Sequence, residues 1–196
     1  MAHVDVSPLP RTFYDRDVRD VARDSLGRFL LRAVPEGLIV GRIVEVEAYL
    51  SDGDPACHAF RGRTPRNAAM FGPPGHAYVY PIHARHCVNL VTEPVGTASA
   101  VLVRALEPLA GIELMQQRRQ LEKLTLLTSG PARLCEALSI NRELNSWNLT
   151  LGERLWLAAG EPVAPRRIEV SRRIGVTSAH DLELRFCIGG CRFVSP

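Results

Sequence analysis

Three side chains able to exchange protons lie close together in the first third of the sequence. Glu47 stands two residues before Tyr49 in GRIVEVEAYL, and His58 follows in the next loop. Residues two apart share one face of a strand, so a carboxylate, a phenol and an imidazole can meet at one edge of a sheet. Such a group suits general acid and base chemistry. The simpler interpretation is a solvated strand face on which Glu45 and Glu47 pair with arginines.

A second group combines aromatic and basic side chains near the same loop. Tyr78 and Tyr80 alternate in AYVYPI and therefore share a face, either as ordinary core or as an aromatic wall. Arginine suits bidentate phosphate contacts, and aromatic residues beside arginines favour a nucleic-acid surface. The alternative is a solvated loop in a chain that prefers Arg to Lys. The arginines concerned are Arg61, Arg63, Arg66 and Arg85.

Length and composition limit the possible folds, partners and locations of the protein. The chain has 196 residues, is 46% hydrophobic and carries a formal net charge of +3, which fits one domain over 1–196 and permits an anionic partner without requiring one. No run reaches the roughly 18 apolar residues of a membrane span, and MAHVDVSPLP lacks the apolar core of a signal peptide. The five scattered cysteines indicate reduced thiols in a cytoplasmic protein. Cys187 and Cys191 lack a matching second pair, so we expect no metal.

Periodicity predicts an α+β fold: a single compact mixed domain with a mostly antiparallel sheet flanked by helices. We expect an amphipathic helix within 8–31, strands over 38–50, 77–82 and 98–106, and helices over 108–121 and 129–140, the last with Ser129 as N-cap. Short strands are expected around Leu155, around Ile168 and within 182–188. Alternation in the strand over 38–50 places Ile43, Glu45, Glu47 and Tyr49 on a polar face. The Gly- and Pro-rich loop over 51–75 is long enough to be functional.

Several sequence blocks in a fixed order resemble the alkyladenine (3-methyladenine) DNA glycosylase family. The blocks are GRIVEVEAYL, DPACHA, TPRNAAMF, PGHAYVY, HCVNLVT, VLVRALEPL and SGPARLCEALSIN. The similarity runs from about Arg42 to Asn141 and continues more weakly through RRIGV to the end. It implies a mixed α/β domain that removes alkylated and deaminated purines from duplex DNA by hydrolysing the N-glycosidic bond. The damaged nucleotide must first be flipped out of the base stack.

The resemblance also implies roles for individual residues. Glu47 would activate the water that attacks the sugar C1′, and Arg104 would help to place that water. Tyr49 and His58 would pack on one face of the flipped base and Tyr80 on the other.

Three further residues complete the implied pocket. Main-chain groups near Ala56 and His58 would bind the edge of the base. Asn89 would crowd the amino group of normal guanine, and the backbone at Val176 would bound the water site. The implied partner is double-stranded DNA with damaged purines, bound by a nucleoid-associated monomer that needs no cofactor.

The sequence departs from the family at the residue that wedges into the duplex. The family has a Tyr followed by Gly-Met after the position of Tyr80, whereas this chain has the one-residue-shorter run PIHARHCVN. His83 is nearest the wedge position, with Ile82 or Arg85 as alternatives. Imidazole is smaller and less apolar than phenol, so we expect the flipped state to be held less well.

Two further considerations concern the reaction. Glycosylases that also cut the strand use an amine, and the only lysine, Lys123, lies in a predicted helix far from the motif blocks. We therefore expect a monofunctional enzyme that leaves an abasic site. One alternative is a non-catalytic binder of distorted or damaged duplex DNA. A second is a metal-dependent hydrolase built from Cys57, His58, His86 and Cys87, whose spacing is atypical of metal sites.

Overall fold

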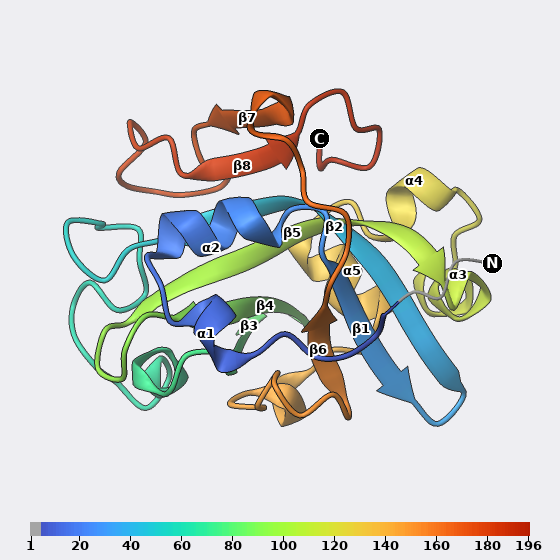
Figure 1. Ribbon diagram of the computed structural model, residues 1–196, viewed down its shortest axis with the longest axis horizontal. Helices are drawn as coiled ribbons and strands as arrows, with labels where there is room; N and C mark the ends of the chain where they lie inside the picture. Colours follow the sequence, from blue (N-terminus) through green and yellow to red (C-terminus); the bar gives the residue numbers. More distant parts are fainter. Residues whose placement is uncertain (1–4) are drawn as a thin grey trace.

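The structure is a computed structural model that describes residues 5–196, and it consists of a curled antiparallel sheet with short helices around it (Figure 1). The sheet has eight strands in these residues, in the order β3-β4-β5-β2-β1-β6, and β8 joins β2 with β7 at its outer edge. The predicted α+β class is confirmed. The strands are β1 (Phe29–Val34), β2 (Gly37–Tyr49), β3 (Ala77–Ile82), β4 (Arg85–Thr92), β5 (Ser99–Ala110), β6 (Leu155–Ala158), β7 (Ile168–Ser171) and β8 (Arg185–Ile188).

Five short α-helices pack around this sheet in the described part of the chain. Helix α2 begins where the Asp17 side chain accepts a hydrogen bond from the Arg19 N–H, and it buries one apolar side against the sheet. None of the helices within residues 5–196 is both long and apolar enough to cross a membrane. The helices are α1 (Arg11–Tyr14), α2 (Val18–Ser25), α3 (Ile112–Arg119), α4 (Leu124–Leu127) and α5 (Pro131–Ala137), and single 3₁₀ turns cover Ala68–Phe71, Arg142–Leu144 and Pro165–Arg167.

Most predicted elements exist, and several details differ. The helix predicted over 108–121 is the shorter α3, because residues 108–110 belong to β5. The last residues of the segment 8–31, predicted to contain a helix, belong to strand β1, because Gly27 adopts a φ of 82° that ends the helix. Strand β4 was not predicted because its residues from Cys87 onward are all buried and show no polar alternation. Ser129 does not cap α5: the N-cap is Gly130, and Ser129 instead accepts hydrogen bonds from Arg133. Lys123 is not helical but precedes α4.

Strand β2 is the centre of the fold and carries the residues of interest. It pairs with β5 along one side, and along the other with β1 and then β8, which lies opposite Glu45, Val46 and Glu47. The predicted polar face is therefore covered, and both glutamates are 0% exposed, so the prediction of a solvated face is wrong. The predicted pairing of these glutamates with arginines is confirmed. A β-bulge between Ile43 and Glu45 also interrupts the expected alternation, and Ile43 joins Val44 in the apolar core.

Candidate active site

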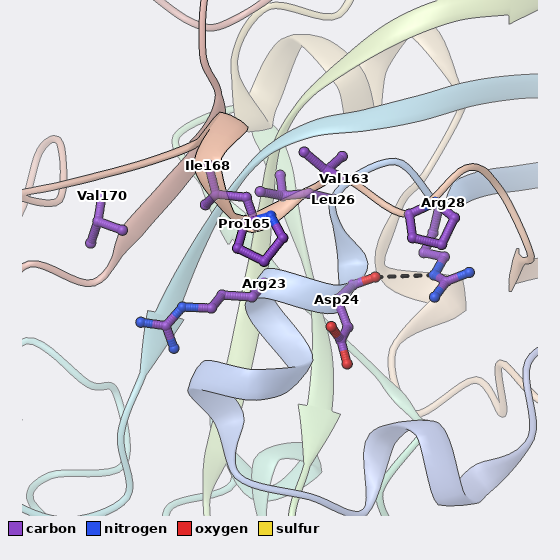
Figure 2. A pocket seen from close by; sticks show the side chains of 9 residues that line it. Arg23, Asp24, Leu26, Arg28, Val163, Pro165, Ile168 and Val170 are labelled. Carbon is purple, nitrogen blue, oxygen red and sulfur yellow. Dashed lines mark hydrogen bonds between the residues drawn. The ribbon is translucent and has the colours of Figure 1, made fainter.

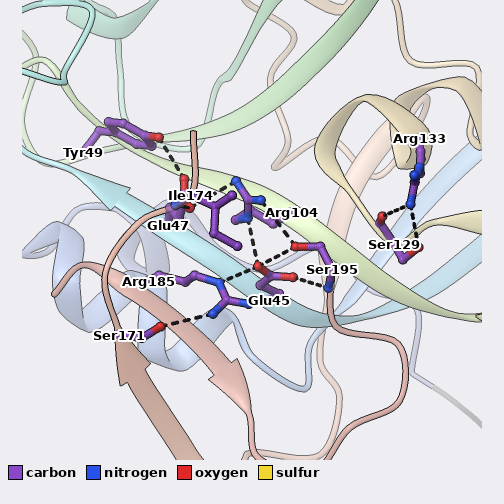
Figure 3. A network of polar contacts seen from close by, with 10 residues as sticks. All are labelled: Glu45, Glu47, Tyr49, Arg104, Ser129, Arg133, Ser171, Ile174, Arg185 and Ser195. Atoms are coloured by element: carbon purple, nitrogen blue, oxygen red, sulfur yellow. Dashed lines mark hydrogen bonds and ion pairs between the residues drawn. The ribbon is translucent and has the colours of Figure 1, made fainter. Parts of the chain in front are cut away.

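The Glu47 carboxylate is buried and held by three donors from three parts of the chain (Figure 3). The Tyr49 hydroxyl donates to Oε2 over 2.8 Å, and the Ile174 N–H donates to Oε1 over the same distance. Arg104 Nη1 lies 3.1 Å from Oε1. An ionised carboxylate offers about four acceptor positions, so these contacts orient Glu47 and leave it room for one more donor.

A second carboxylate, Glu45, lies on the far side of Arg104. Arg104 Nε donates to Glu45 Oε1 over 2.8 Å, and Arg185 Nε donates to the same oxygen over 2.7 Å. Burial by itself raises the pKa of Glu45, but hydrogen bonds from Arg185 and Ser195, with the Arg104 charge, outweigh it and hold that pKa below its usual value. Burial lowers the pKa of Arg104, whereas Glu47 and Glu45 raise it above its ordinary value overall. Both groups are therefore ionised at neutral pH.

A cavity of about 650 Å³ opens beside this cluster, with Tyr49 in its wall. Its volume is that of a small-molecule site, and the loop over 51–75, strand β3 and the segment 175–177 enclose it. The structure thus brings together most of the predicted pocket residues. The predicted residues that line the cavity are Tyr49, Ala56, His58, Arg61, Arg66, Tyr80, Asn89 and Val176.

Aromatic rings form one end of the cavity. The His58 and Tyr80 ring centres are 4.6 Å apart, and Tyr78 lies 5.4 Å from Tyr80. The Tyr78 hydroxyl and His58 Nδ1 share a hydrogen bond of 2.9 Å. Burial, and then the charge of Arg66, lower the pKa of His58, while burial raises the pKa of Tyr78 to about 12. Both side chains are therefore neutral near pH 7.

A buried ion pair fixes the start of the cavity loop. Asp54 accepts two hydrogen bonds from Arg173, of 2.6 and 2.7 Å, and both side chains are 0% exposed. Asp54 also accepts from the N–H groups of Leu50 and Ala56. The Arg173 guanidinium lies 4.6 Å from the centre of the Tyr49 ring. This pair ties the loop, the Tyr49 ring and the chain next to Ile174 into one unit.

Two asparagines fix the walls of the cavity by hydrogen bonds to the main chain. Asn67 Nδ2 donates to the carbonyls of His58 and Gly62, which closes the loop on itself. Asn89 Nδ2 donates to the Tyr78 carbonyl over 3.0 Å, so its amide is held in one orientation in the wall. A side chain locked in this way can exclude a substituent from the cavity.

The remaining predicted site residues lie outside the cavity lining. Glu47 and Arg104 are buried behind Tyr49, and Arg63 is exposed on the loop. His83 is at the exposed tip of the hairpin between β3 and β4, with a φ of 52°. Arg85 Nε lies 3.5 Å from Glu136.

Sequence reasoning missed several contributors to the site. Ile174, two residues before Val176, donates its N–H to Glu47, a contact that was not predicted. Tyr78, for which core and aromatic wall were both predicted, is buried in a core cluster and also lines the cavity. Asp54 and Arg173 lie in the blocks DPACHA and RRIGV, but their pairing becomes visible only in the folded chain.

Other candidate sites are less developed. Within residues 5–196 no group of three or more His, Cys, Asp or Glu side chains is placed to hold a metal ion. A smaller cavity of about 180 Å³ lies between α2 and the segment 162–170 (Figure 2). Its lining is largely apolar, and Arg28 Nε there donates to the Asp24 carbonyl. It carries no buried acid comparable with Glu47.

Comparison with known proteins assigns the chain to a family. The sequence pattern of the methylpurine-DNA glycosylase family matches residues 12–192. A protein of Carboxydothermus hydrogenoformans is 49% identical over 95% of this chain and 98% of its own length, and one of Methanoculleus marisnigri is 50% identical with the same coverage. Another, of Koribacter versatilis, is 44% identical over 97% of this chain and 94% of its own. Each is described as "Putative 3-methyladenine DNA glycosylase".

Site and similarity together define a DNA glycosylase, a hydrolase of N-glycosyl bonds that acts in DNA repair. The chain belongs to the methylpurine-DNA glycosylase family, since the family pattern covers nearly its whole length.

Proposed function

We propose that this chain is a monofunctional glycosylase that excises alkylated or deaminated purines from duplex DNA by means of a water activated by Glu47. The observation that carries the proposal is the Glu47 carboxylate, fully buried and oriented by three donors behind a wall of the cavity. A fixed carboxylate next to a cavity large enough to admit a purine is what hydrolysis of a flipped nucleotide requires.

In the proposed reaction a water oxygen attacks C1′ as the bond between C1′ and the purine nitrogen breaks, and Glu47 takes the proton that the water loses. The purine leaves with the bonding electron pair: a cationic alkylated purine leaves as a neutral base, and a deaminated purine leaves as an anion that takes a proton from solvent. The sugar carries positive charge in the transition state, which a nearby carboxylate stabilises. Arg104 orients this carboxylate from the side away from Tyr49. The products are the free purine and an abasic site.

The aromatic end of the cavity supports recognition of a cationic base. A purine alkylated at N3 or N7 carries positive charge, and a ring face attracts a cation by about 0.5 to 2 kcal/mol. In our proposal Tyr49, His58 and Tyr80 provide these faces. The lowered pKa of His58 keeps its ring neutral, so it does not repel the charged base. Backbone groups near Ala56 and the fixed Asn89 amide would then discriminate among purines.

We assign contact with the duplex to the β3–β4 hairpin and the basic loop. His83 at the hairpin tip is our wedge, and Ile82, which is 42% exposed and lines the cavity, is the competing residue. Arg85 is less suited, because Glu136 competes for its charge. Phosphate contacts would come from Arg61, Arg63 and Arg66, all exposed.

The absence of strand cleavage is supported by the position of the single lysine. Lys123 is exposed just before α4 and does not line the cavity. Schiff-base chemistry at the sugar needs an amine within reach.

Base release from synthetic duplexes tests the proposal. Oligonucleotides with 3-methyladenine, 7-methylguanine, hypoxanthine or ethenoadenine would be compared side by side. We expect release of at least one base by the wild type and a loss of 100-fold or more in Glu47→Gln, with binding retained. Glu107→Gln is the matched control, because Glu107 pairs with Arg42 on the same two strands away from the cluster. Wild-type binding without release of any of the four bases would favour the non-catalytic binder instead.

A further inference from the structure

Glu45 is the most completely bonded side chain of the buried cluster, and the reaction proposed above does not use it. Its Oε1 accepts from Arg104, from Arg185 and from the Ser195 hydroxyl, at 2.8, 2.7 and 2.8 Å. Its Oε2 accepts from the Ser195 N–H over 2.6 Å. These four donors come from three residues, and three of the donors converge on Oε1. Glu45 is therefore fixed in place.

The guanidinium of Arg104 is held on two edges by this arrangement (Figure 3). Nε bonds to Glu45, and Nη2 donates to the Ser195 hydroxyl over 3.3 Å. The guanidinium group is planar and rigid, so fixing two of its nitrogens fixes the third. That third nitrogen, Nη1, is the one that contacts Glu47.

From this geometry we propose that Glu45 is a positioning residue for glycosyl hydrolysis: together with Ser195, it aims Arg104 at Glu47. The inference rests on the proposed role of Glu47 as the base. It assigns a function to the chain around Ser195, which lies 150 residues from Glu45 in sequence.

Charge balance gives the arrangement a second consequence. Glu45 and Glu47 share the positive charge of Arg104, and Glu45 also neutralises Arg185, whose backbone lies opposite Glu47 in the sheet. If Glu45 were neutral, both cations would act on Glu47 and make it a weaker base. The acidic limb of the pH–rate profile would then move to lower pH. The titratable and charged groups facing Glu47 are Arg104 of β5, Arg185 of β8, Tyr49 of β2, Cys87 of β4 and Arg173.

Two variants of the full chain test the proposal, one that removes a single hydroxyl and one that removes the charge of Glu45. Ser195→Ala removes the hydroxyl with its two hydrogen bonds, one to Glu45 and one from Arg104, and keeps the N–H bond to Glu45. We expect a single-turnover rate of base release about 5- to 25-fold lower, since one hydrogen bond is worth about 5-fold. Glu45→Gln removes the shared charge, and we expect a rate about 100-fold lower with the acidic limb at lower pH. Glu107→Gln is again the control and should match the wild type in rate and in pH profile.

The readouts separate positioning from a structural role. Rates would be measured at saturating enzyme and corrected for the folded fraction found by circular dichroism. If both variants lose thermal stability but keep the wild-type rate and acidic limb, the inference is overturned. If Glu47→Gln keeps full activity, the proposed function itself is refuted. If Glu47→Gln loses activity but Glu45→Gln behaves like the wild type, only the positioning role of Glu45 is refuted.

Discussion

The buried pair of Asp54 and Arg173 gives a prediction about folding stability that can be worked from its contacts. Arg173→Met replaces the cation with an apolar chain of similar length. It removes two hydrogen bonds to Asp54, one to the Ala48 carbonyl and the stacking on Tyr49. The larger cost is the Asp54 charge, which stays at 0% exposure with no cation beside it.

Breaking one partner of a buried ion pair costs about 3 to 5 kcal/mol. For a protein of this size that corresponds to a fall of about 6 to 20 °C in the melting temperature. The double variant Asp54→Asn with Arg173→Met removes both charges. It should recover about 2 kcal/mol or more, because the uncompensated charge is gone.

Urea unfolding of the wild type, the two single variants and the double variant measures this coupling. The fluorescence of Trp147 and Trp156 reports unfolding, since both indoles bond to the main chain, at Leu155 and Val6. The reasoning that these two charges depend on each other would be refuted by either of two results. One is a decrease below about 1 kcal/mol in the free energy of unfolding of Arg173→Met, and the other is a decrease in the double variant equal to the sum of the two single decreases.

Further predictions concern pH, chemistry and the wedge. The pKa values of His58 and His76 are lowered on folding, so below about pH 6.5 the unfolded chain binds more protons than the folded chain. The free energy of unfolding should therefore fall between pH 7 and pH 5. A His58→Gln, His76→Gln double variant should flatten that slope in urea titrations. Base release should survive EDTA, and loss of activity on chelation would contradict a reaction carried by Glu47. Borohydride should trap no protein–DNA adduct, and Lys123→Arg should be fully active; a stable adduct lost in that variant would instead indicate lyase chemistry. His83→Ala should weaken retention of a flipped base, measured by fluorescence of a base analogue next to the lesion, more than Ile82→Ala does, and the reverse order would transfer the wedge to Ile82.

Local patterns in the sequence predicted the elements whose residues alternate or carry clear end signals. Strand β3 has the predicted bounds, and α2 lies within the segment 8–31 that was predicted to contain an amphipathic helix. Strand β4 escaped prediction because a strand buried on both faces shows no alternation. The candidate pocket was also accessible from sequence, since Tyr49, His58 and Tyr80 lie within the ordered family blocks.

The sequence by itself determined the family, the antiparallel α+β class and the set of aromatic and acidic residues near the cavity. It could not determine which partners hold the acid, because these come from parts of the chain far from Glu47. Ile174 lies 127 residues from Glu47, and Arg185 lies 140 residues from Glu45. Their positions depend on the pairing of β8 with β2 and on the bulge beside Glu45. Only the tertiary structure decided that both glutamates are buried and ion-paired, because desolvation and charge pairing depend on what covers a strand face.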